Sequence, residues 1–378
     1  MYLTKEEEKI LAGEKGEIPS KAMRILVTLG DIFSAENLIP IESAQIAGIS
    51  YKTIGDAGLE FLEGWSKAKV VVETRMNPTG MDLKEWKKMG VSEKFAEKQL
   101  RIISALTKMG IKPSCSCTPY HAGLVPREGS HIAWSESSAV CFANSVLGAM
   151  TNREGGPSAL SAAITGKTPN YGLHLEENRK ADFLVKIDFP LTFFDYTLLG
   201  YHIGKTVMNK IPALEGAKTT DWHRLKMMGA AMAASGGVAM FMVKGVTPEY
   251  SLKDEIEKIE VEKSDLEAVK DQLTTGDEAD VITFGCPHCS YEEIQDILKN
   301  IKTKKEVWIC TSREVKERIK QKIPENVKIF ADTCMVVAPV EEMGIKTLAT
   351  DSAKSAHYTQ NLSRIKSILK SREELLNG

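Results

Sequence analysis

The sequence has neither an excess of one charge nor a long apolar run, and these two absences exclude several classes of protein. Its 49 Lys and Arg residues nearly balance its 51 Asp and Glu residues, so no strong field favours nucleic acid. The longest nearly uncharged stretch, Met227 to Val243, is shorter than the ~20 residues of a membrane-spanning helix, and it predicts a buried helix that runs into a strand. Residues 1–17 are charged and lack the apolar segment of a secretion signal. We therefore expect a soluble, cytoplasmic protein that binds neither nucleic acid nor membranes.

Internal repeats, low-complexity segments and nucleotide-binding motifs are absent as well. The Gly-rich loop at 151–157 lacks the Gly-Lys-Ser/Thr of a P-loop, so we expect no nucleotide. A chain of 378 residues is too long for one ordinary core, and three regions are predicted. They are an N-terminal α/β region at 1–125, a central α/β region with a helix and the Gly-rich loop at 126–275, and a C-terminal βαβαβ domain with a terminal helix at 276–378.

The C-terminal third shows the clearest pattern, because apolar strand-like runs alternate there with capped helices. The strands are predicted at 280–284, 307–310 and 327–331, and the helices at 291–301 and 313–323. This βαβαβ order indicates a parallel sheet with right-handed crossovers, and hence an α/β fold of three-layer α/β/α domains with mostly parallel sheets. The segment 358–376 is predicted to form one charged terminal helix.

Further upstream, five segments have a readable pattern. Three consecutive valines predict a buried strand at 69–74, and an amphipathic face predicts a helix at 92–109. An apolar helix is predicted at 136–150 and a strand at 181–188. The charged run at 252–269 is predicted to connect two domains.

Three of the seven cysteines follow strand-like runs. They are Cys117 in Ser-Cys-Thr-Pro, Cys286 in Gly-Cys-Pro-His, and Cys334 in Asp-Thr-Cys. In parallel α/β sheets, ligands gather at the carboxyl ends of the strands. Three thiolates at such an edge can hold an iron–sulfur cluster and leave one iron open to a substrate.

Other interpretations of the cysteines remain open. The tetrapeptide from Cys286 to Cys289 also matches a thioredoxin-like redox motif, and either of its cysteines could be the ligand. Structural zinc normally needs four tight ligands, but the chain has only one Cys-x-x-Cys pair. Cys141 and Cys310 lie in apolar runs and are expected to be core thiols. A non-enzymatic protein with redox-sensing or zinc-binding cysteines is therefore the alternative from another class.

Several polar residues are candidates for substrate binding, each with an ordinary structural alternative. Successive backbone N–H groups at 48–50 suit a phosphate, but could form a plain turn. Asn77 could bind a carboxylate or only close a turn, and a helix that begins at Ser137 could hold an anion or only be capped there. The set is Gly48, Ile49, Ser50, Asn77, Ser137, Ser138, Asn144 and Ser145.

Taken together, five motifs resemble the aconitase X family over nearly the whole chain. They are Cys-Thr-Pro-Tyr at 117, Glu-Ser-Ser-Ala-Val at 136, Thr-Asn-Arg at 151, Gly-Cys-Pro-His at 285 and Asp-Thr-Cys at 332. The resemblance implies an aconitase-like fold. It also implies a [4Fe-4S] cluster, or another iron centre, held by the residues that match Cys117, Cys286 and Cys334.

The resemblance further implies a hydro-lyase. The expected reaction removes water from (R)-5-phosphomevalonate to give trans-anhydromevalonate 5-phosphate, in the modified mevalonate pathway of isoprenoid biosynthesis. The alternative substrate is cis-3-hydroxy-L-proline or another small hydroxy acid. In this family the base is a serine on a small subunit that resembles the swivelling domain of aconitase, so no catalytic base is expected on this chain and it should be inactive alone.

Overall fold

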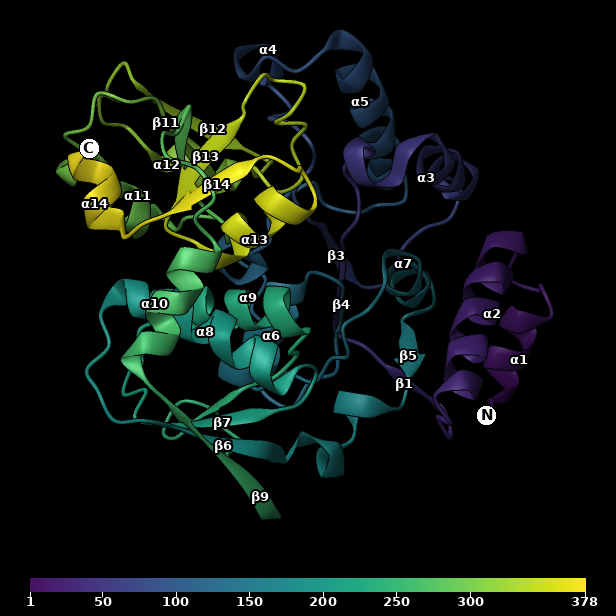
Figure 1. Cartoon of the computed structure of the whole chain (residues 1–378). Coiled ribbons are helices and arrows are strands. Elements are labelled where there is room, and N and C mark those ends of the chain that lie inside the picture. The colour runs from purple at the N-terminus through teal and green to yellow at the C-terminus, as the bar shows by residue number, and fades with distance from the viewer.

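The protein is described by a computed structural model that covers residues 1–378. Figure 1 shows three groups of helices and strands, each organised by a sheet. Every strand pair in these three sheets is parallel, so the predicted α/β class with mostly parallel sheets is confirmed. No helix combines the length and the apolar character needed to cross a membrane.

The N-terminal region contains a three-stranded sheet of order β3-β2-β4. Its strands are β2 (Ser43–Ile46), β3 (Glu73–Met76) and β4 (Ala133–Trp134), and β1 (Leu38–Pro40) pairs separately with β5 (Lys167–Pro169). The helices are α1 (Lys5–Leu11), α2 (Glu17–Ile32), α3 (Tyr51–Trp65), α4 (Trp86–Met89), α5 (Glu93–Lys108), α6 (Ser137–Phe142) and α7 (Gly156–Thr165). Single turns of other helix types lie at Pro119–Ala122, Ala143–Leu147, Gly172–His174 and Glu176–Arg179.

The strand predicted at 69–74 begins later than expected. The backbone N–H groups of Val70 and Val71 donate to the carbonyls of Met109 and Ala163, so these valines lie between a helix end and another helix. Strand pairing starts only at Glu73. Three consecutive β-branched residues indicate burial but cannot distinguish a strand from an extended segment packed on helices.

The central region has a four-stranded sheet of order β8-β7-β6-β9. Its strands are β6 (Ala181–Ile187), β7 (Pro212–Glu215), β8 (Met242–Val243) and β9 (Leu252–Val261), and its helices are α8 (Phe193–Val207), α9 (Trp222–Gly236) and α10 (Lys263–Gln272). Figure 1 shows these three helices on one face of the sheet. The buried helix running into a strand, predicted from Met227 to Val243, appears as α9 and β8.

The predicted connector at 252–269 is wrong, because this segment forms the edge strand β9 and most of α10. Its charged side chains are largely exposed, and edge strands carry charge that discourages pairing with other chains. High charge therefore marked an exposed edge of the sheet instead of a linker.

The C-terminal sheet has the order β12-β11-β10-β13-β14. Its strands are β10 (Val281–Phe284), β11 (Val307–Thr311), β12 (Val327–Ala331), β13 (Thr347–Thr350) and β14 (Lys366–Leu369), and its helices are α11 (Tyr291–Asn300), α12 (Arg313–Arg318), α13 (Ala353–Asn361) and α14 (Arg372–Asn377). The parallel unit from β10 to β12 matches the predicted βαβαβ arrangement.

The single terminal helix predicted at 358–376 is wrong. The chain leaves α13 at Asn361, adds the buried strand β14 beside β13, and then starts α14 with a Ser371–Glu374 capping box. The short apolar run before Ser371 can be buried against the sheet, which a continuous charged helix could not achieve.

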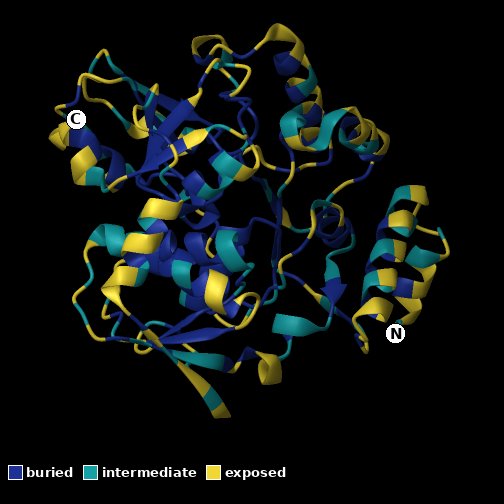
Figure 2. Ribbon diagram, viewed as in Figure 1, coloured by how far each residue is buried: buried dark blue, intermediate teal, exposed yellow.

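Buried residues lie mainly where the helices cover the sheets (Figure 2). The N-terminal and C-terminal regions meet at the ends of their sheets, because the Thr79 N–H donates to the Asp332 carbonyl at 2.7 Å. This bond joins the loop after β3 to the loop after β12. The carboxyl ends of strands from two sheets thus face one another.

Candidate active site

Three of the seven cysteines line one cavity of about 180 Å³ at this junction. They are Cys117, Cys286 and Cys334, and all three are buried. Cys141 belongs to the apolar core of the central region, and Cys310 lies within β11. The structure thus groups the three predicted cysteines around one cavity. The other four do not line it, although Cys310 packs in the same buried cluster as Cys286 and Cys334.

The cysteines reach the cavity from three loops. Cys286 follows β10 through Gly285, which has φ +99°, and a Cβ at Gly285 would collide with the Cys310 carbonyl. Only glycine combines this conformation with such a close approach. Cys334 follows β12 through Asp332, which also has a positive φ of 68°. Cys117 lies in the extended segment after α5, where the Ser116 N–H donates to the Met76 carbonyl at 3.0 Å.

His288 ties the three loops together. Its backbone N–H donates to Cys117 Sγ at 3.2 Å, and its ring nitrogens contact Ser116 Oγ at 3.2 Å and the Thr333 carbonyl at 2.9 Å. A carbonyl can only accept, so Nε2 carries the proton and Nδ1 accepts from Ser116. Burial lowers the pKa of His288 to about 4, which keeps the ring neutral. The histidine therefore holds the three cysteine loops together through its hydrogen bonds.

A buried ion pair forms another part of the cavity lining. Lys354 Nζ lies 2.5 Å from Glu136 Oε1 and donates to Ser138 Oγ at 3.1 Å. Glu136 Oε2 also accepts from Ser138 Oγ at 2.6 Å and from the Ala139 N–H at 2.7 Å. Burial opposes ionisation of Glu136, but the Lys354 ammonium and these hydrogen bonds hold the pKa of the carboxyl below its usual value. Both groups are charged.

Lys354 was not among the predicted site residues, although a signal for it was present in the sequence. Lys354 follows the Asp-Ser pair at the end of β13, and β13 lies beside β10 in the sheet. Its position at the same sheet edge as Cys286 would have been visible if the strand had been predicted. Arg153 and Tyr358 also line the cavity and were not predicted.

Of the predicted substrate-binding residues outside the turn at 48–50, two line the cavity and two do not, and Ser138 is bound to the Glu136–Lys354 pair. Asn77 and Ser137 line the cavity, and Asn77 Oδ1 is buried without a hydrogen-bond partner. Asn144 and Ser145 do not line it, because Asn144 binds backbone groups of Thr151 and Ala239 and Ser145 accepts from the Phe241 N–H. We therefore assign Asn144 and Ser145 a structural role instead of a substrate contact.

The turn at 48–50 borders the cavity through its neighbour Ala47. No backbone N–H group of Gly48, Ile49 or Ser50 donates a hydrogen bond within the chain. The Ser50 side chain is already engaged, since its Oγ donates to the Val337 carbonyl at 2.8 Å and caps α3. Any ligand of this turn would therefore bind the backbone.

The donor set of the cavity fits a cluster better than a single metal ion. No three His, Cys, Asp or Glu side chains are arranged to hold one ion, which would need all its thiolate ligands within about 2.3 Å. A cluster spreads its thiolates over several irons, and three cysteines leave one iron without a protein ligand. Burial raises the pKa of Cys117 to about 12, and bound metal is what favours the thiolate in such surroundings.

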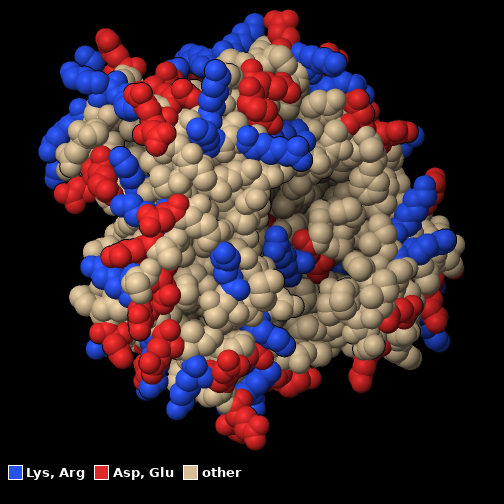
Figure 3. Space-filling view, viewed as in Figure 1, with Lys and Arg blue, Asp and Glu red and all other residues tan.

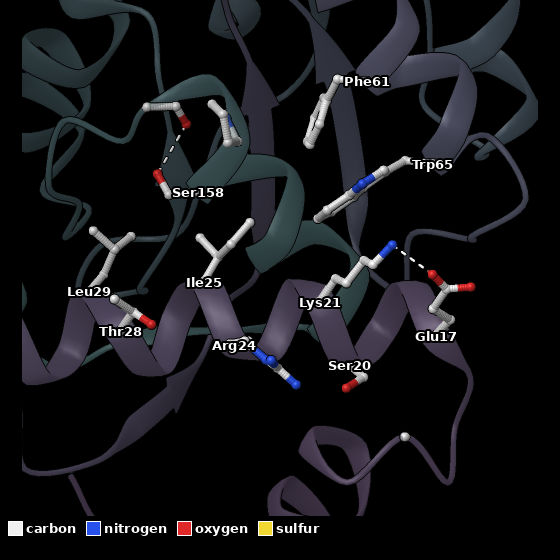
Figure 4. Close-up of a pocket in the computed structure, with 13 residues that line it drawn as sticks. Glu17, Ser20, Lys21, Arg24, Ile25, Thr28, Leu29, Phe61, Trp65 and Ser158 are labelled. Carbon is white, nitrogen blue, oxygen red and sulfur yellow. Dashed lines mark hydrogen bonds and ion pairs between the residues drawn. The ribbon is translucent and has the colours of Figure 1, made fainter.

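Cavity size alone does not identify this site. A larger cavity, about 1030 Å³, lies between α2, α3 and α7, and its lining includes Phe61, Trp65 and the Lys21–Glu17 ion pair (Figure 4). No cysteine lines it. Figure 3 shows a hollow near the middle of the face viewed, with acidic and basic atoms inside it.

Models of one protein family and several known proteins match this chain over nearly its full length. Three models of aconitase X match the chain, the first domain over 1–177, the second over 181–271 and the third over 279–378. The large subunit of phosphomevalonate dehydratase from Methanocaldococcus jannaschii is 50% identical over 100% of both chains, and that from Methanothermobacter thermautotrophicus is 48% identical over 96% of this chain and 94% of the relative.

A solved structure and a more distant relative extend the comparison. The crystal structure of Thermococcus kodakaraensis aconitase X in its holo-form superimposes with a TM-score of 0.92 and 46% sequence identity, covering 100% of this chain and 99% of that one. The cis-3-hydroxy-L-proline dehydratase of Hypocrea jecorina is 33% identical, and 95% of this chain matches 65% of that protein.

Proposed function

The chain belongs to the aconitase X family, and we propose that it is the large subunit of a hydro-lyase that dehydrates (R)-5-phosphomevalonate to trans-anhydromevalonate 5-phosphate. The identity of about 50% over the full length to relatives named phosphomevalonate dehydratase large subunit carries this proposal. Such a reaction belongs to a mevalonate pathway of isoprenoid biosynthesis. Relatives named cis-3-hydroxy-L-proline dehydratase are more distant, so that substrate is the alternative.

We propose that Cys117, Cys286 and Cys334 hold an iron–sulfur cluster of the [4Fe-4S] type or another iron centre. Their common cavity and their three-thiol donor set support this assignment. When bound, such a cluster supplies an iron that acts as a Lewis acid toward the departing hydroxyl group. His288 orients the three cysteine loops around it through its three hydrogen bonds.

The remaining lining residues bind and orient the substrate. The reaction takes a proton from the carbon next to the carboxylate and a hydroxyl from the adjacent carbon, which releases water and forms a double bond. Lys354 places a buried positive charge where negative charge develops on the carboxylate, and Glu136 holds the ammonium in place. Asn77 Oδ1 is free to accept a hydrogen bond from a substrate hydroxyl, and Ser137 lies close by in the lining.

A second, smaller chain is needed to complete this site. The end-to-end relatives are named large subunits, which implies a small subunit. The cavity of about 180 Å³ is smaller than the ~300–1,000 Å³ of complete ligand pockets, as expected if a partner supplies the opposite wall. We propose that this partner resembles the swivelling domain of aconitase and carries the base. The extra third of the Hypocrea jecorina relative would then correspond to the partner.

The test is an assay of the chain purified without oxygen together with its small partner. The complex is offered 5-phosphomevalonate and cis-3-hydroxy-L-proline side by side, and formation of the unsaturated product is followed. We expect turnover of the phosphorylated substrate at a kcat/KM at least 100-fold higher. Preference for the imino acid would favour the alternative, and a colourless protein with bound zinc and no turnover would refute both.

A further inference from the structure

A buried ammonium group reaches the cysteine loop at 286–289 from the central region. Lys226 lies in α9, and its side chain is 1% exposed. Its Nζ atom donates to the His288 carbonyl at 3.0 Å and lies 2.5 Å from Glu293 Oε2. Lys226 does not line the cavity, and no step of the proposed reaction uses it. Lysine is almost never buried this fully unless its charge is paired, so its place beside the loop needs a physical reason.

Glu293 is the buried partner that keeps this lysine charged and in place. It lies in the first turn of α11, its side chain is 4% exposed, and its Oε2 atom also accepts from the Ser290 N–H at 2.9 Å. Burial opposes ionisation of Glu293, but the Lys226 ammonium and the Arg372 guanidinium hold the pKa of the carboxyl well below its usual value. The lysine and the carboxylate therefore form a charged pair next to the cysteine loop.

The carbonyl groups of the loop are held by side chains from two regions of the protein. The Cys286 carbonyl accepts from Ser352 Oγ, which belongs to the same C-terminal region as the loop. The His288 carbonyl accepts from Lys226 instead, and α9 belongs to the central region. The ammonium therefore fixes the loop relative to a second sheet.

The residue that Lys226 holds is the one that connects the three cysteine segments. The His288 N–H donates to Cys117 Sγ at 3.2 Å, and its Nε2 atom donates to the Thr333 carbonyl at 2.9 Å, one residue before Cys334. His288 itself is two residues after Cys286. A change in the orientation of the His288 peptide would therefore move all three thiols relative to one another.

We infer that Lys226 is a positioning residue, which fixes through the His288 peptide how Cys117, Cys286 and Cys334 face one another. The inference rests on the proposed function, since it takes the three cysteines to be the iron ligands. Apolar side chains of the same shape often give as much stability as a buried ion pair, so stability does not explain the pair. A directional hydrogen bond does explain it, because an apolar side chain cannot hold a peptide group in one orientation.

The test compares Lys226→Met with a matched control, Arg179→Met. Arg179 is also a buried cation, 2% exposed, which pairs with Glu249 at 2.7 Å and donates to the Leu173 carbonyl at 3.1 Å. It has no hydrogen bond to the cysteine loop. The double variant Lys226→Met/Glu293→Gln removes the carboxylate that the single change leaves without its lysine, and it serves where Lys226→Met folds poorly.

Three quantities are measured for each full-length protein. Amide hydrogen exchange at 285–290 in the iron-free chain reports the loop directly. The rate of iron loss to a chelator and the visible circular dichroism spectrum report the reconstituted site. Urea denaturation of the iron-free chain gives the stability against which both are compared.

We expect Lys226→Met and Arg179→Met both to lower the urea midpoint, because each leaves a carboxylate without its buried cation. Only Lys226→Met should speed amide exchange at 285–290 and iron loss by at least 10-fold each and alter the visible spectrum. The double variant should regain much of the urea midpoint but keep the fast exchange, the fast iron loss and the altered spectrum. With the small subunit, its kcat should fall at least 10-fold while KM stays within about threefold, since the residues that line the cavity are unchanged.

Two results would overturn the inference. Parent-like exchange and iron loss in the double variant would show that the pair only supports the fold. Equal effects of Arg179→Met on the loop would show that any loss of stability loosens it. A parent chain that binds no iron contradicts the proposed cluster instead, and the exchange comparison still tests the role of Lys226, so the two failures are distinguishable.

Discussion

At the scale of single residues, the three cavity cysteines should differ from the other thiols in iron binding. Ser substitution of Cys117, Cys286 or Cys334 removes one of three ligands, so each variant should lose most of its iron and all dehydration activity. Cys141→Ser and Cys310→Ser are the controls, because neither side chain lines the cavity. Cys310 packs in the same buried cluster as Cys286 and Cys334, so Cys141→Ser is the cleaner control of the two. Iron analysis and the visible spectrum of the anaerobic protein provide the measurement.

One outcome would revise the assignment within the Cys-Pro-His-Cys tetrapeptide. Cys289 belongs to the apolar core under α11, and its N–H donates to the Cys310 carbonyl at 3.0 Å. Cys286 lines the cavity instead. If Cys289→Ser lost its iron while Cys286→Ser kept it, the wrong member of the pair would have been chosen.

The Lys354–Glu136 pair should affect stability and activity in separable ways. Lys354→Met leaves the Glu136 carboxylate buried without its cation, which typically costs about 3–5 kcal/mol of unfolding free energy. Adding Glu136→Gln removes the stranded charge, so the double variant should regain much of that stability. It should stay at least 100-fold below the parent in kcat, because the positive charge near the carboxylate is still missing.

Urea denaturation of the iron-free chain and steady-state assays of the complex separate the two effects. A double variant that regained activity together with stability would show that the pair only supports the fold.

At the scale of elements, an ionic cluster fastens the loop before α4 to the start of α12. Arg313 binds both Asp82 and Asp332, with the Asp82 carboxylate at 2.6 Å, and Lys316 also reaches Asp82 at 3.1 Å. Asp82 Oδ2 accepts from the Ala331 N–H at 2.9 Å, at the end of β12. Because Cys334 follows only three residues later, this cluster holds one of the cysteine loops.

Breaking this cluster should loosen the cysteine site as well as the interface. Arg313→Met leaves two carboxylates without their shared cation and should lower the unfolding free energy by about 3 kcal/mol. Iron should also dissociate faster to a chelator. Lys84→Met is the control, since its pair with Glu317 spans the same interface but is 67% and 60% exposed and should contribute less than about 1 kcal/mol. Equal effects of the two variants would argue against a positioning role for the cluster.

At the scale of the whole molecule, the isolated chain should bind iron but should not turn over substrate. The two chain residues that could replace an external base are both engaged. His288 has hydrogen bonds at both ring nitrogens, and Ser138 Oγ lies between Glu136 and Lys354. We therefore expect the base to come from the partner, which should bury on the order of 2,000 Å² or more against this chain.

Steady-state dehydration by the reconstituted chain, with and without the small subunit, measures this dependence. Activity should rise by at least 100-fold when the partner is added. The base and the Lewis acid must both lie in contact with the two carbons between which the double bond forms. Robust activity without a second polypeptide would mean that a base on this chain was overlooked.

Some of these features follow from the sequence alone. The α/β class and the βαβαβ unit were predictable because alternating apolar runs and capped helices are local patterns. The choice of Cys286 and Cys334 was possible because each follows such a run. Cys117 follows α5 and an extended segment instead of a strand, and the family motifs around the three cysteines are specific only when they occur together. Their role as ligands stays a prediction.

Other features depended on tertiary structure. The C-terminal strands β13 and β14 are short. β13 pairs with β10, whose residues lie more than 60 positions earlier, and β14 pairs with β13. Lys354 and Glu136 are 218 residues apart, and the sequence around either residue does not indicate that the two will be buried against each other. Local periodicity and capping thus determined the elements and the cysteine motifs, whereas long-range strand pairing decided which charges share the cavity.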